Sequence, residues 1–143
     1  MSLYLQAETT FTLLLAALLG GLIGLDRESA DRAAGLRTHM LVCMGSCLFT
    51  LLSAYAFEGG DPGRVASQIL PGMGFLGAGA ILKERGTIIG LTTAASMWTT
   101  AAIGMALGSG AWLLALVGTI IVWTILSIMH RVSPSKRTKI SDQ

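Results

Sequence analysis

Apolar residues form five long runs along the chain, and short polar or glycine-containing segments separate these runs. A helix needs about 20 apolar residues to cross the hydrocarbon core of a bilayer, within a range of about 17–25. The pattern therefore predicts five spanning helices, which cover about residues 9–25, 38–57, 65–82, 88–107 and 111–129. Short connections favour antiparallel neighbours. The sequence predicts an all-α membrane protein whose transmembrane domain is a compact bundle of five helices over residues 1–130, with a polar cytoplasmic tail over 131–143.

The third run is the least regular of the five. It holds Gln68 and Pro71 together with four glycines, Gly72, Gly74, Gly77 and Gly79. It fits either a full span or a re-entrant loop, which is tolerated only where other helices cover it. Because proline has no N–H to donate, Pro71 is expected to deepen a break in this helix.

The basic residues predict the orientation. With five spans, nine of the ten Lys and Arg residues fall on one side, and Arg64 alone falls on the other. Lys and Arg accumulate in cytoplasmic loops, so the N-terminus is predicted outside and the C-terminus inside. The charged triplet Lys83-Glu84-Arg85 is then the cytoplasmic turn between the third and fourth helices.

Small residues recur at a spacing of four. The fourth run carries Thr92, Ser96, Thr100, Gly104 and Gly108, the first carries Ala16, Gly20 and Gly24, and the third carries Gly74 and Ala78. The second run places Ser46, Thr50 and Ser53 on one face. Small residues let membrane helices approach closely, so each stripe is either a seam inside the bundle or a contact with a second copy. A homo-oligomer is expected.

Composition excludes some classes of function. Charged residues make up 13% of the chain and the net charge is +2, which argues for lipid as the surroundings and against nucleic acid as a partner. No nucleophile–base pair, phosphate loop or zinc spacing is present, so we expect no enzyme and no certain cofactor. Cys43 and Cys47 are expected to be two buried thiols.

Polar side chains gather at the predicted cytoplasmic rim, on both sides of the first turn and at the start of the fourth run. They comprise Asp26, Arg27, Glu28, Arg37, Thr38, Thr92 and Thr93. Three explanations stay open: salt bridges that fix helix ends, a docking surface for a protein, or a Mg²⁺ site with Asp26 and Glu28 as oxygen ligands.

Four stretches, "GGLIGLDRE", "GLRTHMLVCMGS", "ILPGMGFLGAGAIL" and "GLTTAASMWTTAAIG", resemble the membrane domain of the bacterial MgtC/SapB family. The resemblance covers about residues 14–110 and implies a multi-pass protein of the inner membrane with five spans. It further implies a role in adaptation to low magnesium or acid stress, and in survival of some pathogens in their host. The family's motif positions carry over to Asp26–Glu28, Gly35–Thr38, Gly74–Gly79 and Gly90–Thr93.

Two functions follow as expectations. The first is a non-enzymatic membrane factor that binds membrane partners such as ATP synthase, as the resemblance implies. The second is a cation transporter or channel, whose path runs along Gln68, Pro71 and the glycines of the third run and past Thr92, Ser96 and Thr100. Longer relatives add a cytoplasmic C-terminal domain, so the chain is expected to resemble the short, SapB-like branch.

Overall fold

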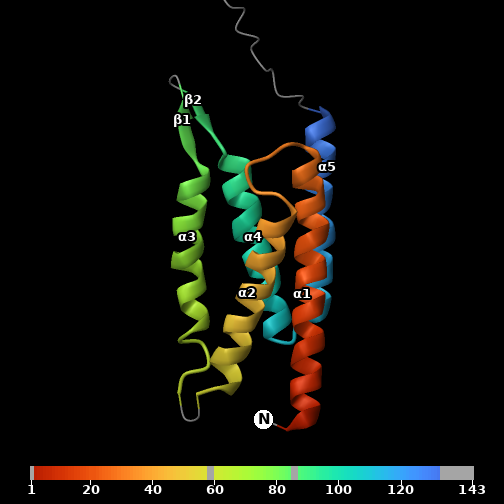
Figure 1. The fold of residues 1–143 in the computed structure, drawn as a ribbon, viewed down its shortest axis with the longest axis vertical. Coiled ribbons are helices and arrows are strands. Elements are labelled where there is room, and N and C mark those ends of the chain that lie inside the picture. Colours follow the sequence, from red (N-terminus) through yellow and green to blue (C-terminus); the bar gives the residue numbers. More distant parts are fainter. Residues whose placement is uncertain (1, 58–59, 85–86, 133–143) are drawn as a thin grey trace, which may run out of the picture.

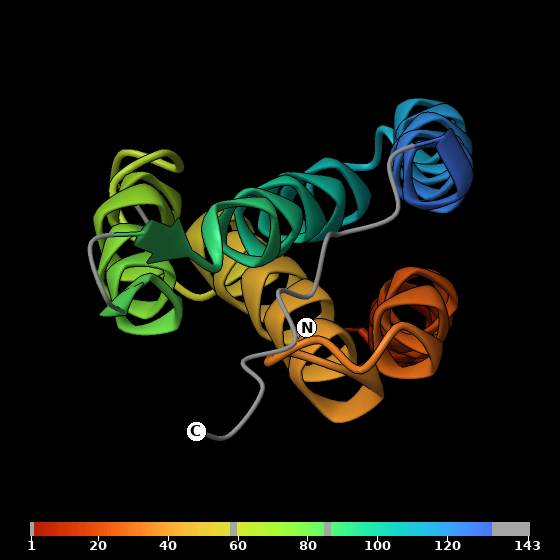
Figure 2. The same cartoon turned by 90° about the horizontal axis from the view of Figure 1, so that it is seen from above.

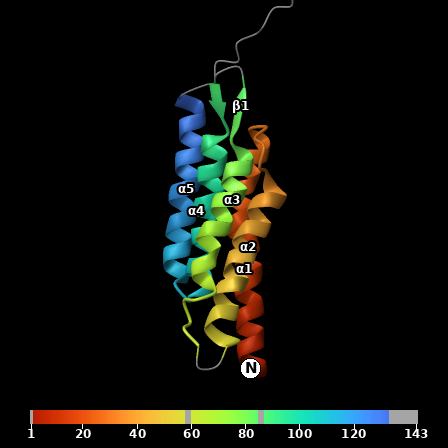
Figure 3. The same ribbon diagram turned by 90° about the vertical axis from the view of Figure 1, so that its left-hand side faces the viewer.

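In the computed structural model, residues 2–57, 60–84 and 87–132 are described, and these ranges contain five α-helices. Figure 1 and Figure 3 show the helices aligned along the long axis of the molecule. The elements are α1 (Leu3–Ser29), α2 (Leu36–Tyr55), the 3₁₀ turn η1 (Ala66–Gln68), α3 (Ile69–Ala80), β1 (Leu82–Glu84), β2 (Thr87–Ile89), α4 (Leu91–Gly108) and α5 (Trp112–Val132).

The five helices alternate in direction along the chain (Figure 1). The α1–α2 turn, the β1–β2 hairpin and the end of α5 lie at one end of the bundle, and the α2–α3 and α4–α5 connections lie at the other. The predicted sequence of five antiparallel helical segments is therefore confirmed. We call the end with the α1–α2 turn the charged end, because Arg27, Arg32, Arg37 and Lys83 lie there, whereas Arg64 lies at the opposite end. Arg85 lies outside the described residues, as do residues 133–143 of the tail predicted over 131–143, whose first two residues end α5.

The third segment contains an α-helix that continues through Pro71, so the break expected at this proline is wrong. The chain enters α3 through η1, and Pro71 is the third residue of the α-helix. An N–H in the first turn has no partner inside its own helix, so a proline there costs no hydrogen bond. At 12 residues, α3 is only about 18 Å long, shorter than the predicted span over 65–82.

The connection between α3 and α4 also differs from the prediction of a bare turn. Residues 82–84 and 87–89 pair as a two-stranded antiparallel ribbon, with Leu82 opposite Ile89 and Lys83 opposite Ile88. The fourth helix consequently starts at Leu91, three residues later than expected. Gly90 makes this junction possible, since its φ is +90° and a Cβ there would collide with the carbonyl of Ala80.

Helix α2 is wedged between α1 and α4 (Figure 2), and glycines form both seams. A Cβ added at Gly20 of α1 would lie 2.5 Å from the carbonyl oxygen of His39, and one at Gly108 of α4 would lie 2.7 Å from that of Cys47. A Cβ at Gly104 would overlap the carbonyl of Cys43. The stripes predicted on α1 and α4 are therefore seams inside the bundle.

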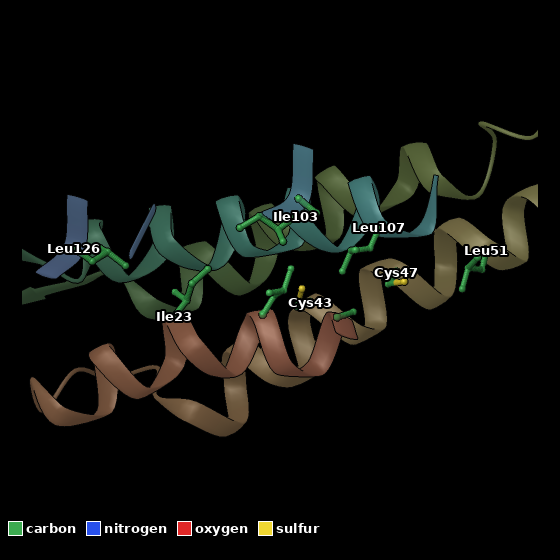
Figure 4. Packing of buried hydrophobic residues seen from close by; sticks show 10 residues of the cluster. Ile23, Cys43, Cys47, Leu51, Ile103, Leu107 and Leu126 are labelled. Carbon is green, nitrogen blue, oxygen red and sulfur yellow. The ribbon is translucent and has the colours of Figure 1, made fainter. Parts of the chain in front are cut away.

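The apolar core fills the space among α1, α2, α4 and α5 (Figure 4). Ile23, Cys43 and Cys47 are completely buried in it, and Ile103 and Leu107 of α4 pack against them. Both cysteines are free thiols, as expected.

Helix α3 stands at the edge of the bundle beside α4 (Figure 2), and its small residues behave differently from those of α1 and α4. Gly77 is buried, with Ala94 of α4 3.6 Å from the position of its missing Cβ. Gly72, Gly74 and Gly79 have open space where a Cβ would be. The Gly74–Ala78 stripe is thus exposed, so of its two predicted roles it is not a seam inside the chain.

Within the described residues, α1 and α2 are long and apolar enough to cross a bilayer, and α5 contributes an apolar stretch over Trp112–Ile128. Large apolar side chains cover the outside of the bundle, among them Phe11, Leu18, Phe75 and Ile120, each more than 60% exposed. An exterior of this kind is stable in lipid and not in water. Orientation in the membrane stays a prediction.

That orientation can be measured with cysteine labelling. Because Cys43 and Cys47 are buried, Arg32→Cys and Arg64→Cys each introduce one reactive thiol without removal of the native ones. We expect a membrane-impermeant maleimide to modify Arg64→Cys in intact spheroplasts and Arg32→Cys only in inverted vesicles. The reverse pattern would place the charged end outside.

Candidate functional site

Arg27 lies in the last turn of α1, where its side chain turns into the bundle. Only 3% of it is exposed. Its Nη2 donates to the hydroxyl of Thr93 on α4 over 3.5 Å, a long bond, and its Nε has no hydrogen-bond partner. The described residues provide no ion pair for the guanidinium. A cation in this position is costly unless something else compensates it.

His39, fully buried, links α2 to α4 a little deeper in the bundle. Its Nδ1 lies 2.9 Å from the carbonyl oxygen of Gly35, and its Nε2 lies 3.1 Å from the hydroxyl of Ser96. A carbonyl only accepts, so Nδ1 carries the hydrogen and Nε2 of the neutral ring is an acceptor. Ser96 has a single hydroxyl hydrogen, for which His39 Nε2 and the carbonyl oxygen of Thr93 are alternative acceptors. Ser96 also lies 2.8 Å from the carbonyl of Thr93, which connects His39 to the residue that Arg27 contacts.

The two carboxylates flanking Arg27 have separate partners. Asp26 accepts from the hydroxyl of Ser127 on α5 over 2.5 Å, which ties α1 to α5. Glu28 accepts from the backbone N–H of Leu36 over 2.7 Å, and so caps the N-terminus of α2, which has no cap from Gly35 itself. Each carboxylate therefore holds a helix end in place.

The other predicted rim residues are divided between the interior and the surface. Thr93 is buried, whereas its neighbour Thr92 is exposed, because one residue along a helix turns the side chain by about 100°. Arg37 is exposed and Thr38 is partly buried. The structure thus brings Arg27, Thr93 and Ser96 together and leaves Thr92 and Arg37 facing outward.

The arrangement does not fit a magnesium ion. Mg²⁺ takes carboxylates and waters in near-octahedral geometry. Asp26 and Glu28 are directed to α5 and to α2, and the described residues contain no group of three His, Cys, Asp or Glu that could hold a metal. The buried group between them is a cation, which repels Mg²⁺.

The residues predicted to line a transport path do not form one surface. Gln68, Gly72 and Ser46 border an apolar groove of about 420 Å³ between α2 and α3. Ser96 and Thr100 are buried and belong to the network around His39. Gly74 and Gly79 are exposed on α3, while Gly104 is closed against α2.

Two residues of this region, His39 and Ser127, were not predicted to form hydrogen bonds between helices. The spacing of four that separates His39 from Gly35 and from Cys43 places it on the buried face of α2. Ser127 gave no signal, because a lone serine in an apolar run has no preferred partner in sequence.

With this geometry in place, the comparisons define the class of protein. The sequence model of the MgtC family matches residues 13–134. The chain therefore belongs to the MgtC family, and with its apolar helices it is a membrane protein.

Three relatives illustrate the similarity. "Putative magnesium transporter YhiD" of Escherichia coli (strain K12) is 44% identical over 137 residues, which cover 90% of this chain and 64% of that protein. Protein MgtC of Brucella abortus (strain 2308) is 43% identical over 124 residues, 87% of this chain and 52% of that protein. Protein MgtC of Salmonella typhimurium (strain LT2) is 48% identical over 110 residues, 77% of this chain and 47% of that protein. The chain thus spans only about half to two thirds of these relatives. No solved structure matches.

Proposed function

We propose that the protein is a non-enzymatic, multi-pass factor of the bacterial inner membrane that aids adaptation to low magnesium or acid stress by binding other membrane proteins. The name of one relative, "Putative magnesium transporter YhiD", supports the connection with magnesium. The observation that carries the proposal is the closed interior: α1, α2 and α4 meet backbone to backbone at Gly20, Gly104 and Gly108. A bundle packed in this way acts through its surface.

Two surfaces are available for partners. The outer side of α3 exposes Phe75 beside glycines that leave room for a neighbouring helix, and the charged end exposes Arg37 and Thr92. Small residues on a lipid-facing helix favour contact with another helix. We propose a homo-oligomer through α3, and ATP synthase as a membrane partner.

Growth in low magnesium tests the charged end. We expect Asp26→Ala, Glu28→Ala and Arg37→Ala to lose complementation while the protein still inserts in the membrane. Glu28→Gln is the informative control, because its amide oxygen can still accept from Leu36 N–H. If Glu28→Gln also fails, the charge is needed for function; if it complements, the cap alone matters. Complementation by all three alanine variants would overturn the role of the charged end.

Co-purification tests the partner. The wild-type protein, extracted from membranes in mild detergent, is expected to retain subunits of ATP synthase, and Arg37→Ala, whose side chain is exposed, is expected to retain less. Equal amounts of ATP synthase with an unrelated membrane protein of similar size would exclude it as a specific partner.

The alternative is a transporter or channel for Mg²⁺ or another cation. The groove between α2 and α3, with Gln68 and Ser46 on its border, is the feature that favours it. A path through that groove needs a second wall, which an oligomer would have to supply, since the groove is open and mostly apolar.

A further inference from the structure

The first turn of α4 presents unused backbone donors at the charged end. The helix has 18 residues, its N-cap residue Gly90 provides no side-chain cap, and its first intrahelical bond runs from Ala94 N–H to Gly90. The N–H groups of Leu91, Thr92 and Thr93 have no partner among the described residues. Such groups, with the positive end of the helix dipole, attract anions.

The side chain of Arg27 brings further unsatisfied N–H donors to the same place. Its side chain is 97% buried and reaches the first turn of α4 through Thr93. A guanidinium has five N–H donors, but within the described part of the chain this one makes a single long bond, and its Nε makes none. Thr93 accepts that bond, and no acceptor is present among the described residues for its own hydroxyl hydrogen. The cluster therefore has an excess of donors and lacks acceptors.

The neighbouring carboxylates do not supply these acceptors. Asp26 accepts from Ser127 and Glu28 accepts from Leu36 N–H. Two other charged or titratable side chains lie near Arg27. Arg32 on the α1–α2 turn adds positive charge, and His39 on α2 has its Nδ1 hydrogen-bonded to the carbonyl oxygen of Gly35. Asp26 attracts Arg27 without a hydrogen bond to it, so the N–H donors of Arg27 and of the first turn of α4 are not satisfied from within the described chain.

We propose that Arg27, Thr93 and the first turn of α4 form a binding site for a phosphate-type oxyanion. Phosphate oxygens accept several bonds at once, which matches the planar fork of a guanidinium, and helix N-termini bind phosphate through their free N–H groups. The same chemistry is present in free orthophosphate and in the headgroup of an anionic phospholipid. The site is independent of the proposed partner and of magnesium.

Thermal unfolding of the purified full chain tests the site. In nonionic detergent and at constant ionic strength, we expect orthophosphate to raise the unfolding temperature in a saturable manner. In Arg27→Gln, the phosphate concentration that gives half of the maximal rise in unfolding temperature is expected to increase at least about tenfold. This change corresponds to the loss of one charge-assisted interaction. Arg64→Gln, which removes an exposed arginine at the opposite end, is the matched control and should respond as the wild type does.

The variant remains informative because it should fold. Arg27→Gln removes a buried charge that has no ion pair among the described residues, so without phosphate it is expected to unfold at the same temperature as the wild type or higher. A second arm adds phosphatidylglycerol to the delipidated protein. A response to orthophosphate alone assigns a soluble anion, and a response to the lipid alone assigns a headgroup. If neither raises the unfolding temperature, or if Arg27→Gln responds as the wild type does, the site holds only water and the proposal is wrong.

Discussion

Alanine in place of Gly104 is expected to separate α2 from α4 and to lose most of the folded protein. A Cβ at this position would overlap the carbonyl oxygen of Cys43 and lie 3.1 Å from the Cβ of Ser46. Both groups sit on the backbone of α2, so no side-chain rotation relieves the collision. Extra volume in a packed core typically costs about 1–3 kcal/mol, and a clash with backbone belongs at the upper end. Unfolding in detergent, followed by circular dichroism, measures the loss.

The matched control is Gly74→Ala on α3. Gly74 lies in the middle of its helix and nothing lies within 4 Å of the position of its Cβ. Since alanine favours a helix over glycine by up to about 1 kcal/mol, this variant should be as stable as the wild type or more stable. Equal destabilisation by the two substitutions would contradict the assignment of Gly104 to an internal seam.

Removal of the Ser96 hydroxyl is expected to have the second-largest effect. Ser96→Ala leaves Nε2 of His39 without a partner in a fully buried position. An unsatisfied buried polar group costs about 1–3 kcal/mol, so the free energy of unfolding should fall by that amount. Thr99→Ala is the control on the same helix, because among the described residues the Thr99 hydroxyl bonds to carbonyls of its own helix, those of Ala95 and Ser96.

A double-mutant cycle separates the bond from other effects. His39→Ala alone removes the ring together with its bonds to Ser96 and Gly35. If the histidine and the serine interact as described, adding Ser96→Ala to His39→Ala should cost clearly less than Ser96→Ala alone. Additive losses would mean that the contact between α2 and α4 does not depend on this hydrogen bond.

The sequence predicted the central seams because their signal is repetitive. A small residue at every fourth position of α4, from Ser96 to Gly108, marks one face of a helix whatever its partner is. On α3 the equally regular pair Gly74 and Ala78 faces outward, which leaves contact with a second copy as the remaining alternative. A stripe shows that close approach is allowed, and only the three-dimensional arrangement decides whether a helix of the same chain fills the space.

Local geometry explains the other differences between the predicted and the observed elements. The β1–β2 hairpin has three residues per strand, too few for an alternation to stand out between two apolar runs. Pro71 suggested a break because the start of α3 at Ile69 could not be located from apolar residues alone. Thr92 and Thr93 are adjacent in sequence, and the rotation of α4 about its own axis determines which of them faces the bundle. In the structure Thr93 faces inward and contacts Arg27.

Closed packing of α1, α2 and α4 is the central claim, and magnesium flux tests it most directly. Purified protein is reconstituted into liposomes that contain a magnesium-sensitive dye, with empty liposomes as the control and an imposed magnesium gradient across the membrane. Because glycine seams bring these helices into backbone contact and the predicted path residues lie on separate surfaces, we expect no flux above that of empty liposomes. Saturable magnesium entry that requires the protein would contradict a factor that acts only by contact and would favour the transporter.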